Sequence, residues 1–392
     1  MPEGKFSTSM DHFPGKPSIL LATNHLYGWT GSETLILTLI DGLHRHGCKL
    51  TVYVRHLDHS WATSLCDRNI VITDNLDSLI THNFDLAHVQ HNTCLMDIRA
   101  AFPKLPIVFS SLGVSPFLEQ PAPFDCGISQ YLAISEEVRE NLIAQGAPSE
   151  KVKIVRNLVN ELQFTSIRPI RSQPKNILVI SNKMDESRVM VLKAAANIMG
   201  ANIRFIGGIS STKPQNQLAI EINTADIVVS LGRGVVEAML CGRVPLVYDI
   251  NGGDGLVTPD NINELRTCNF SGRLYRKNYT VSALVAELEK YRQGLGPRLR
   301  EIAKEQFGLS SNLPDLLDIY FKATNTHRDS DPISQEAITF CSNQAREELV
   351  YTRNFQSRAI QLENELNRVK STASWHVTKP LRLVAFLWRK LQ

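Results

Sequence analysis

The sequence predicts an α/β protein with two Rossmann-like, doubly wound domains that face a cleft, followed by a helical tail. From residue 18 to about residue 320, short apolar runs alternate with amphipathic helical segments, which is typical of parallel sheets with crossover helices on both faces. A polar stretch over 164–175, with two prolines, interrupts this alternation once and is interpreted as a linker. With 392 residues, the chain is long enough for two domains.

The predicted boundaries are 1–165 for the N-terminal domain, 166–323 for the C-terminal domain and 324–392 for the helical tail. In the first domain we expect strands at 18–23, 49–55, 86–90, 107–110, 130–135 and 152–156, and helices at 33–46 and 136–144. In the second domain we expect strands at 176–181, 202–206, 226–230 and 244–249, and helices at 188–199 and 235–241. A ligand of such sheets binds beyond the carboxyl ends of the strands.

The segment 334–370 is predicted to be one polar helix, because leucines and a valine recur among charges and no Gly or Pro occurs. Two interpretations stay open. The helix either forms a coiled coil that makes the protein an oligomer, or it is a solvated helix packed on its own domain.

The charge of the chain is concentrated at its end. The 42 basic and 39 acidic residues give +3, yet residues 371–392 hold four bases and no acid, together with Trp375 and Trp388. A neutral body argues against a protein that binds nucleic acid over a broad positive face. The basic, aromatic segment instead predicts contact with an anionic membrane surface, with packing on the body as the alternative.

The seven cysteines are widely spaced and form no C-x-x-C pair, so we expect reduced thiols rather than a zinc site or a disulfide framework. No acidic metal motif is visible either. Residues 1–16 have no apolar core, and no apolar run reaches about 18 residues, so we expect neither a secretory signal nor a spanning helix. The predicted location is the cytoplasm, with peripheral contact at the inner face of the membrane.

The loop before the first helix is the first candidate site. Gly28 and Gly31 would let backbone amides approach an anion at the helix N-terminus. The same residues also form a capping box, in which Thr30 and Glu33 satisfy the start of the helix. The loop is not G-x-G-x-x-G, so a nicotinamide dinucleotide is not indicated.

The second candidate site is a glycine-bracketed helix between two apolar strands. Gly232 and Gly234 open it, and Glu237 lies in its otherwise apolar middle, where a carboxylate needs a partner. That partner is either the ribose of a nucleotide, which we favour, or Arg233 or Arg243. Downstream, we expect residues 249–255 to be a flexible loop whose glycines let the backbone approach a ligand.

The third candidate is His88, which with His91 follows a predicted strand and is expected near the floor of the cleft. It either contacts substrate or makes structural hydrogen bonds. A metal is not expected, because no third ligand of matching type is near in the sequence.

These segments resemble, in order, the motifs of nucleotide-sugar glycosyltransferases of the GT-B fold, specifically the large retaining family 4, over about residues 17–323. The matching segments are Thr30-Gly31-Ser32-Glu33, Asp85-Leu-Ala-His88, Leu132-Ala-Ile-Ser135, Gly146-Ala-Pro-Ser-Glu-Lys151 with Arg156-Asn157, and Glu237-Ala-Met-Leu-Cys-Gly-Arg-Val-Pro245. The end of the chain, from Ser371 to Leu391, is similar to the ending of many bacterial surface-polysaccharide glycosyltransferases.

The resemblance implies site roles residue by residue. It implies that His88, Lys183 and Arg233 are catalytic. It implies that the donor is bound by Gly31, Ser32, Arg188, Gly232, Gly234, Val235 and Glu237. Two family features are absent: Val229 stands where the family carries a first Glu, and Ser181-Asn182-Lys183 replaces the usual phosphate-gripping G-R-L segment.

The implied activity is transfer of a glycosyl unit, with retention, from a nucleoside diphosphate sugar to a glycan or lipid-linked acceptor. The donor is a substrate, and no tightly bound cofactor or metal is implied. The competing classes are a non-catalytic GT-B subunit that binds a partner glycosyltransferase or glycan, and a nucleotide-sugar epimerase on the same architecture.

Overall fold

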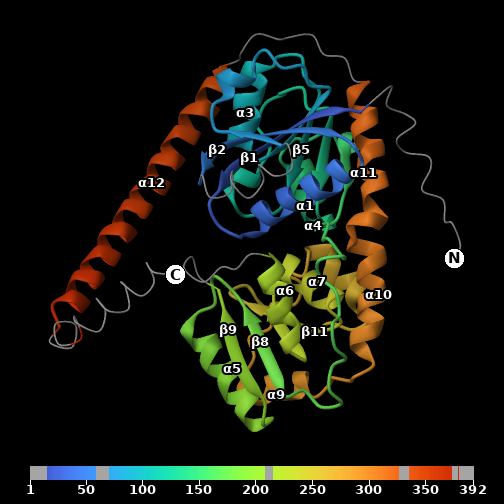
Figure 1. The fold of residues 1–392 in the computed structure, drawn as a ribbon, viewed down its shortest axis with the longest axis vertical. Helices are drawn as coiled ribbons and strands as arrows, with labels where there is room; N and C mark the ends of the chain where they lie inside the picture. Colours follow the sequence, from blue (N-terminus) through green and yellow to red (C-terminus); the bar gives the residue numbers. More distant parts are fainter. Residues whose placement is uncertain (1–15, 59–69, 208–214, 326–334, 373–377, 379–392) are drawn as a thin grey trace, which may run out of the picture. The chain divides into compact units, whose positions relative to one another are not determined.

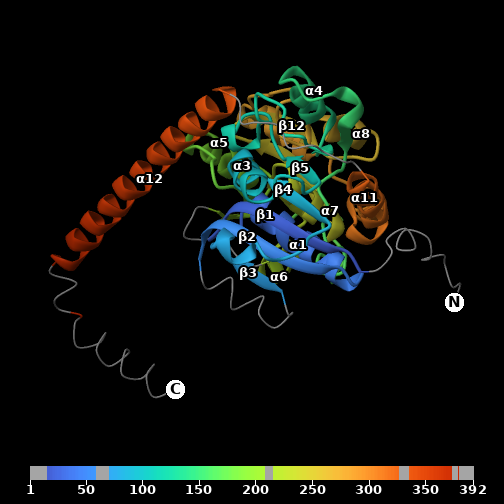
Figure 2. The same ribbon diagram turned by 90° about the horizontal axis from the view of Figure 1, so that it is seen from above.

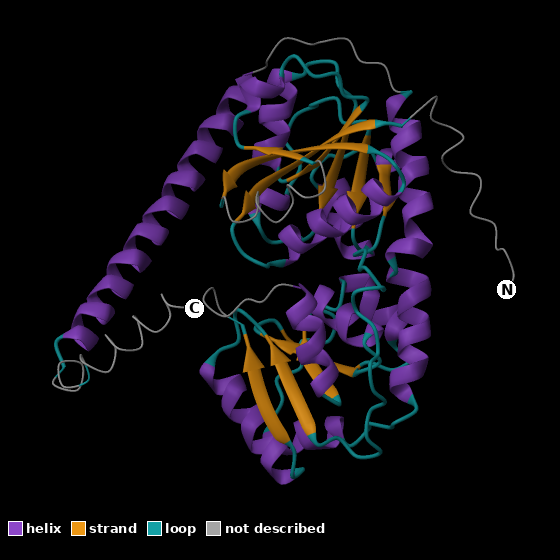
Figure 3. Cartoon of the chain, viewed as in Figure 1, coloured by secondary structure: helices purple, strands orange, loops and turns teal. Residues whose placement is uncertain are grey.

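The computed structural model describes residues 16–58, 70–207, 215–325, 335–372 and 378. The chain folds as two compact units, residues 1–331 and 332–392. The first unit contains two separate sheets, each with helices packed against it (Figures 1 and 3). This arrangement confirms the predicted α/β class.

The N-terminal domain is built on a seven-stranded, wholly parallel sheet in the order β3-β2-β1-β4-β5-β6-β7. Its strands are β1 (Ser18–Leu26), β2 (Lys49–Leu57), β3 (Val71–Thr73), β4 (Leu86–Gln90), β5 (Ile107–Ser111), β6 (Gln130–Ala133) and β7 (Val152–Ile154). Its helices are α1 (Gly31–Arg45), α3 (Asn92–Ala101) and α4 (Glu136–Ala144), with short 3-10 turns η1 (Leu76–Leu79), η2 (Phe117–Glu119) and η3 (Ser149–Lys151). The predicted strands of this domain are all present, and the pattern missed β3 and α3.

The C-terminal domain has a five-stranded sheet in the order β12-β11-β10-β8-β9. Its strands are β8 (Asn176–Ile180), β9 (Asn202–Ile206), β10 (Ile227–Ser230), β11 (Val244–Asp249) and β12 (Gly252–Leu256). Its helices are α5 (Glu186–Ile198), α6 (Gln215–Thr224), α7 (Arg233–Leu240), α8 (Ile262–Leu265), α9 (Val281–Leu288) and α10 (Leu295–Phe307), with one 3-10 turn, η4 (Arg266–Cys268).

The segment 249–255 is not the flexible loop that the sequence suggested. Most of it forms β12, which pairs antiparallel with β11 and is buried along its whole length. Its glycines make room for neighbouring protein atoms: a Cβ on Gly253 would lie 2.4 Å from Cε2 of Tyr279, and one on Gly255 would lie 2.8 Å from Glu287 Oε1. These glycines are explained by packing, so they do not indicate a ligand.

Helix α11 (Leu309–Thr324) belongs to the N-terminal domain, although it follows the C-terminal domain in sequence. Its apolar face, including Leu313, Leu317 and Tyr320, is part of the core that also contains β1 and α1. Figures 1 and 2 show α11 beside that sheet. The predicted boundary at 323 therefore groups α11 with a domain whose core it does not join.

The chain crosses between the domains at two adjacent places. The amide of Val159 donates to the carbonyl of Phe307 at 2.9 Å, and the amide of Leu309 donates to the carbonyl of Val159 at 3.0 Å. The segment predicted as the linker, 164–175, lies beyond this crossing. It is fastened to the C-terminal domain, where the buried guanidinium of Arg243 binds the carbonyl of Arg168 and Ser166 Oγ.

The second unit contains α12 (Gln335–Lys370), which confirms the predicted polar helix. None of the helices in the described part of the chain combines the length and the apolarity needed to cross a membrane. The segment expected to contact a membrane, 371–392, falls almost wholly outside the described residues.

Candidate donor-binding pocket

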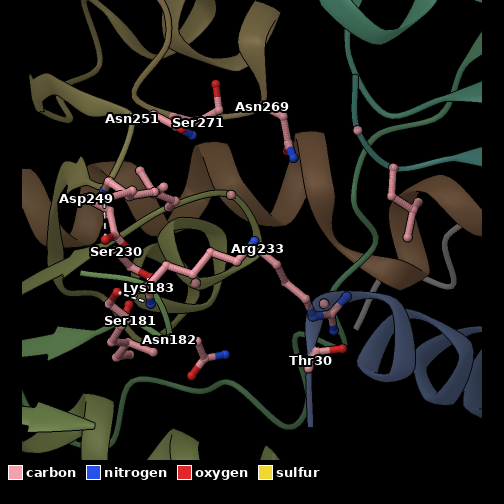
Figure 4. Close-up of a pocket in the computed structure, with 18 of the residues that line it drawn as sticks. Thr30, Ser181, Asn182, Lys183, Ser230, Arg233, Asp249, Asn251, Asn269 and Ser271 are labelled. Atoms are coloured by element: carbon pink, nitrogen blue, oxygen red, sulfur yellow. Dashed lines mark hydrogen bonds between the residues drawn. The ribbon is translucent and has the colours of Figure 1, made fainter. Parts of the chain in front are cut away.

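A cavity of about 520 Å³ lies where the carboxyl ends of strands from both sheets converge (Figure 4). Its volume is in the usual range for small-molecule sites. The N-terminal domain lines it with residues from the loops after β1 and β5, and the C-terminal domain with residues from the loops after β8, β10 and β11. Of the predicted site residues, those that line the cavity are Gly31, Lys183, Gly232, Arg233, Gly234 and Glu237.

The start of α1 contributes the N-terminal edge of the pocket. The predicted capping box is present, and Glu33 accepts hydrogen bonds from the amides of Tyr27, Gly28 and Thr30 at 2.7, 2.7 and 2.8 Å. Glu33 therefore holds the loop in shape. A Cβ on Gly31 would meet no atom within 4 Å, so the helix start faces open space. Ser32 is the next residue but does not line the cavity, and its Oγ lies 3.5 Å from Oγ1 of Thr30.

The start of α7 contributes the opposite edge. Gly232 has a φ of 54°, in the region that favours glycine, and a Cβ on Gly234 would lie 2.3 Å from Ser230 Oγ. The amides of Gly234 and Val235 already donate to the carbonyls of Leu231 and Gly232. This helix N-terminus therefore has fewer free donors than the sequence suggested. Val235 itself is fully buried and does not line the cavity.

Glu237 has the protein partner that the sequence left open. Nε of Arg233 donates to its Oε1 at 2.8 Å, and both side chains are buried. Burial raises the pKa of Glu237, and the charge of Arg233 opposes that rise. Its second oxygen, Oε2, accepts no hydrogen bond from the described residues. That oxygen is the acceptor that a ligand in the cavity could use.

Arg233 also joins the two domains. Its Nη1 donates to the carbonyl of Leu158 at 2.6 Å, and its Nη2 donates to Thr38 Oγ1 in α1 at 2.8 Å. All three nitrogens of the guanidinium are therefore engaged by protein groups, including Nε on Glu237. Three of the five N–H donors of the side chain are therefore used within the protein.

Lys183 is the exposed cation of the pocket (Figure 4). It makes no ion pair with any residue in the described part of the chain. Its loop is shaped by Ser181, whose Oγ accepts hydrogen bonds from the amides of Lys183 and Met184 at 3.1 and 2.9 Å. A cation without an ion pair at the end of β8 favours an anionic ligand.

Asp249 is a pocket residue that the sequence did not single out as a site. It is buried at the end of β11, and burial raises the pKa of its carboxyl, while a hydrogen bond from Ser181 and the charges of Arg188 and Lys183 oppose the rise. The sequence did offer a signal, because Asp249 is an acidic residue at the end of an apolar run. The signal was missed because Asp249 was grouped with the glycine-rich segment 249–255.

The remaining edge of the pocket carries polar groups in fixed orientations. Asn269 Oδ1 accepts from Asn157 Nδ2, and Asn251 Nδ2 donates to the carbonyl of Ser271. Nε and Nη2 of Arg273 bind both carboxylate oxygens of Glu137 in α4, and these hydrogen bonds raise the pKa of the guanidinium. Sequence reasoning missed these residues because they lie in an irregular segment without a motif.

Arg188 does not line the cavity. It lies in the first turn of α5 and binds the N-cap residue Asp185, with Asn278 Oδ1 at 3.5 Å. Of the two predicted phosphate-binding cations after β8, the structure therefore places only Lys183 in the pocket.

The structure does not bring His88 to the pocket. Its Nδ1 is hydrogen-bonded to the hydroxyl of Tyr320 in α11, and its Nε2 is 2.9 Å from Ser110 Oγ. Burial lowers its pKa to about 3, so the imidazole is neutral. The expectation that His88 lies at the cleft floor is corrected: the side chain is buried in the core, between Ser110 of the sheet and Tyr320 of α11.

His91 supports the pocket indirectly. Its Nδ1 accepts from the amide of Asn24 at 3.1 Å, and its Nε2 lies 3.6 Å from Oε1 of Glu119. Oε2 of Glu119 in turn accepts from the amide of Leu112 at 2.6 Å, where the pocket-lining loop 112–116 begins. Within the described residues, no group of three or more His, Cys, Asp or Glu side chains is arranged to hold a metal ion.

No protein-family model and no curated protein sequence matches this chain. Solved structures match its fold. Anabaena HepE in complex with UDP and glucose is 12% identical, with a TM-score of 0.54 over 77% of this chain and 98% of that chain. A glycosyltransferase from Rickettsia africae is 14% identical, with a TM-score of 0.52 over 80% of this chain and 100% of that chain. With its two sheets and their packed helices, this chain has the GT-B fold.

Proposed function

We propose that this protein is a glycosyltransferase that moves a sugar from a nucleoside diphosphate sugar to a glycan or lipid-linked acceptor, with retention of the anomeric configuration. The observation that carries the proposal is the cavity at the carboxyl ends of both sheets, lined by the unpaired cation Lys183 and the acceptor Glu237. The neighbours support it, since the HepE structures contain UDP, UDP and glucose, or UDP-glucose.

In the proposed reaction, negative charge develops on the departing diphosphate. Lys183 is the residue we assign to that charge, together with the amides at the open N-terminus of α1 near Gly31. A positioned cation acts more strongly in a water-excluded cleft than in bulk water. The second oxygen of Glu237 is assigned to the ribose hydroxyls.

Arg233 is assigned a positioning role rather than contact with the donor, because protein groups occupy its guanidinium. It orients Glu237 and ties α7 to α1. Gly232 and Gly234 shape the turn that presents these groups, and Val235 packs beneath it. We do not keep Arg188 or His88 among the groups that touch the donor.

The test is a thermal-shift panel of nucleoside diphosphate sugars on the full chain, followed by donor hydrolysis and transfer assays. We expect at least one nucleotide sugar to stabilise the wild type and Glu237→Gln to lose that shift. Glu301→Gln, at an exposed position on α10, is the matched control and should keep it. If the wild type neither binds nor turns over any member of the panel, the enzyme assignment fails.

A non-catalytic GT-B subunit is the second candidate, and one observation favours it. Val229, at the place where the resemblance puts a donor-contacting Glu, is fully buried in β10 and offers no polar group. Such a subunit would bind a partner glycosyltransferase or glycan. It would show no turnover in the assays above even with donor bound.

The proposed working place is the cytoplasm, with the basic, aromatic segment 371–392 at the inner face of the membrane. Its four cations and two tryptophans support this assignment.

A further inference from the structure

The end of α12 carries an apolar stripe. Apolar residues recur at alternate spacings of four and three, the repeat of a coiled-coil seam. They are Phe355, Ala359, Leu362, Leu366 and Val369. Leu362, Leu366 and Val369 are 50%, 48% and 50% exposed. A continuous apolar row at this exposure marks an interaction surface rather than scattered surface residues.

Charged residues flank the stripe on both sides. Arg358 and Glu365 precede seam positions, and Glu363 and Lys370 follow seam positions. None of the four makes an ion pair with another described residue, and Arg358 instead donates to Gln361 at 2.8 Å. Other helices of the chain pair their charges internally, as Lys322 and Asp318 do in α11. These four charges are therefore available to pair with another helix.

We propose that a second copy of this chain covers the stripe, as a parallel, in-register, two-stranded coiled coil over residues 355–370. In that arrangement Arg358 and Glu365, which precede seam positions, each face the residue five positions later on the other helix. Arg358 then faces Glu363 of the partner subunit, and Glu365 faces Lys370 of the partner subunit. All four charges are matched by opposite charges.

The antiparallel alternative matches fewer charges. With the same seam, Arg358 would face Glu365 of the partner subunit, while Glu363 and Lys370 would have no opposite charge. The charge pattern therefore selects the parallel pair. The seam positions before Phe355 are Thr352 and Glu348, so the apolar pairing begins at Phe355. Because it spans about two heptads, we expect a concentration-dependent dimer.

The first test measures the dimer dissociation constant of the full chain by sedimentation equilibrium. Leu366→Glu places a charge in the seam and should raise the constant by about tenfold or more. Ile360→Glu is the matched control, because Ile360 is 59% exposed on the same helix but outside the stripe, and it should change the constant by less than about threefold. Circular dichroism checks that helix content is kept.

The second test reads the orientation. Arg358→Glu should weaken the dimer, and Arg358→Glu combined with Glu363→Arg should restore it, because the parallel pair exchanges its two charges. If the helices were antiparallel, the dimer of the double variant would stay as weak as that of Arg358→Glu. Leu366→Cys should form an intermolecular disulfide under oxidation, whereas antiparallel helices would keep these residues about 16 Å apart along the axis.

Three results would overturn the proposal. They are a wild type that is monomeric at every concentration, equal effects of Leu366→Glu and Ile360→Glu, or the absence of charge-exchange rescue. The proposal does not depend on the proposed enzyme activity, since neither measurement uses a nucleotide sugar.

Discussion

The imidazole of His88 in β4 is hydrogen-bonded to the hydroxyl of Tyr320 in α11, 232 residues further along the chain. Ser110 occupies the other ring nitrogen. This relationship fastens α11 to the N-terminal sheet and explains why the histidine is not available to a substrate.

The first prediction concerns pH and stability. The unfolded chain binds a proton at His88 near its ordinary pKa of 6.5, whereas burial lowers the pKa to about 3 in the fold. Between these values only the unfolded state is protonated, so the free energy of unfolding should fall as pH decreases, by up to about 1.4 kcal/mol per unit. Above pH 6.5 this contribution is fully present.

Urea unfolding at pH 7 and pH 4.5 measures the effect. His88→Gln should reduce the pH dependence, with the remainder coming from His25, whose pKa burial lowers to about 4. His82→Gln, at an exposed position, should leave it unchanged. A His88→Gln variant with the wild-type slope would show that other groups cause it.

The second prediction concerns Lys183. Lys183→Ala should weaken UDP binding by about ten- to a hundredfold, since hydrogen bonds to charged groups contribute about 1.5–3 kcal/mol. Lys183→Arg should retain most of the affinity. Titration calorimetry measures the affinity for UDP. The control is Lys104→Ala, because Lys104 is exposed and lies outside the pocket. Equal affinities for Lys183→Ala and the wild type would remove Lys183 from the site.

The third prediction concerns the Arg233 and Glu237 pair. Arg233→Ala leaves a buried carboxylate without its partner and should cost about 3–5 kcal/mol in the free energy of unfolding. Replacing both residues, as Arg233→Met with Glu237→Leu, should recover much of that stability but not nucleotide binding. Arg204→Ala, which breaks an exposed pair with Glu221, should cost less than about 1 kcal/mol. Denaturant unfolding measures the free energy of unfolding of all three variants. Equal losses in all three would contradict a buried, mutually dependent pair of Arg233 and Glu237.

The fourth prediction concerns the glycines of β12. Gly253→Ala should lower the free energy of unfolding by about 1–3 kcal/mol, because its Cβ would overlap the ring of Tyr279. Gly294→Ala, where a Cβ meets nothing within 4 Å, should be close to neutral. If both substitutions were neutral, β12 would not be packed as described.

The fifth prediction concerns the segment 371–392. Its deletion should abolish sedimentation with anionic liposomes while leaving the unfolding transition of the body unchanged. The wild type should lose the same interaction as salt is raised and should not bind neutral liposomes. Equal sedimentation of the truncated and full chains would refute membrane contact through this segment.

Much of the architecture could be predicted from the sequence because its signals are local. The apolar runs at β1 or β11 and the alternating pattern between them depend on residues close together in the chain. The glycine-bracketed start of α7 and the capping box of α1 are local in the same way, and both line the pocket as expected. The polar composition of α12 likewise indicated its helix.

The tertiary structure decided what depends on distant contacts. Helix α11 looks like part of the C-terminal domain until Tyr320 meets His88, and residues 252–256 look like a loop until β11 and Tyr279 pack against them. Nothing in the sequence around Arg233 predicts that it is hydrogen-bonded to Leu158 and Thr38. The burial of a side chain and many of its partners depend on neighbours tens to hundreds of residues away. Only the folded chain therefore distinguishes Lys183, an exposed cation in the pocket, from Arg233, which is buried and bound by protein groups.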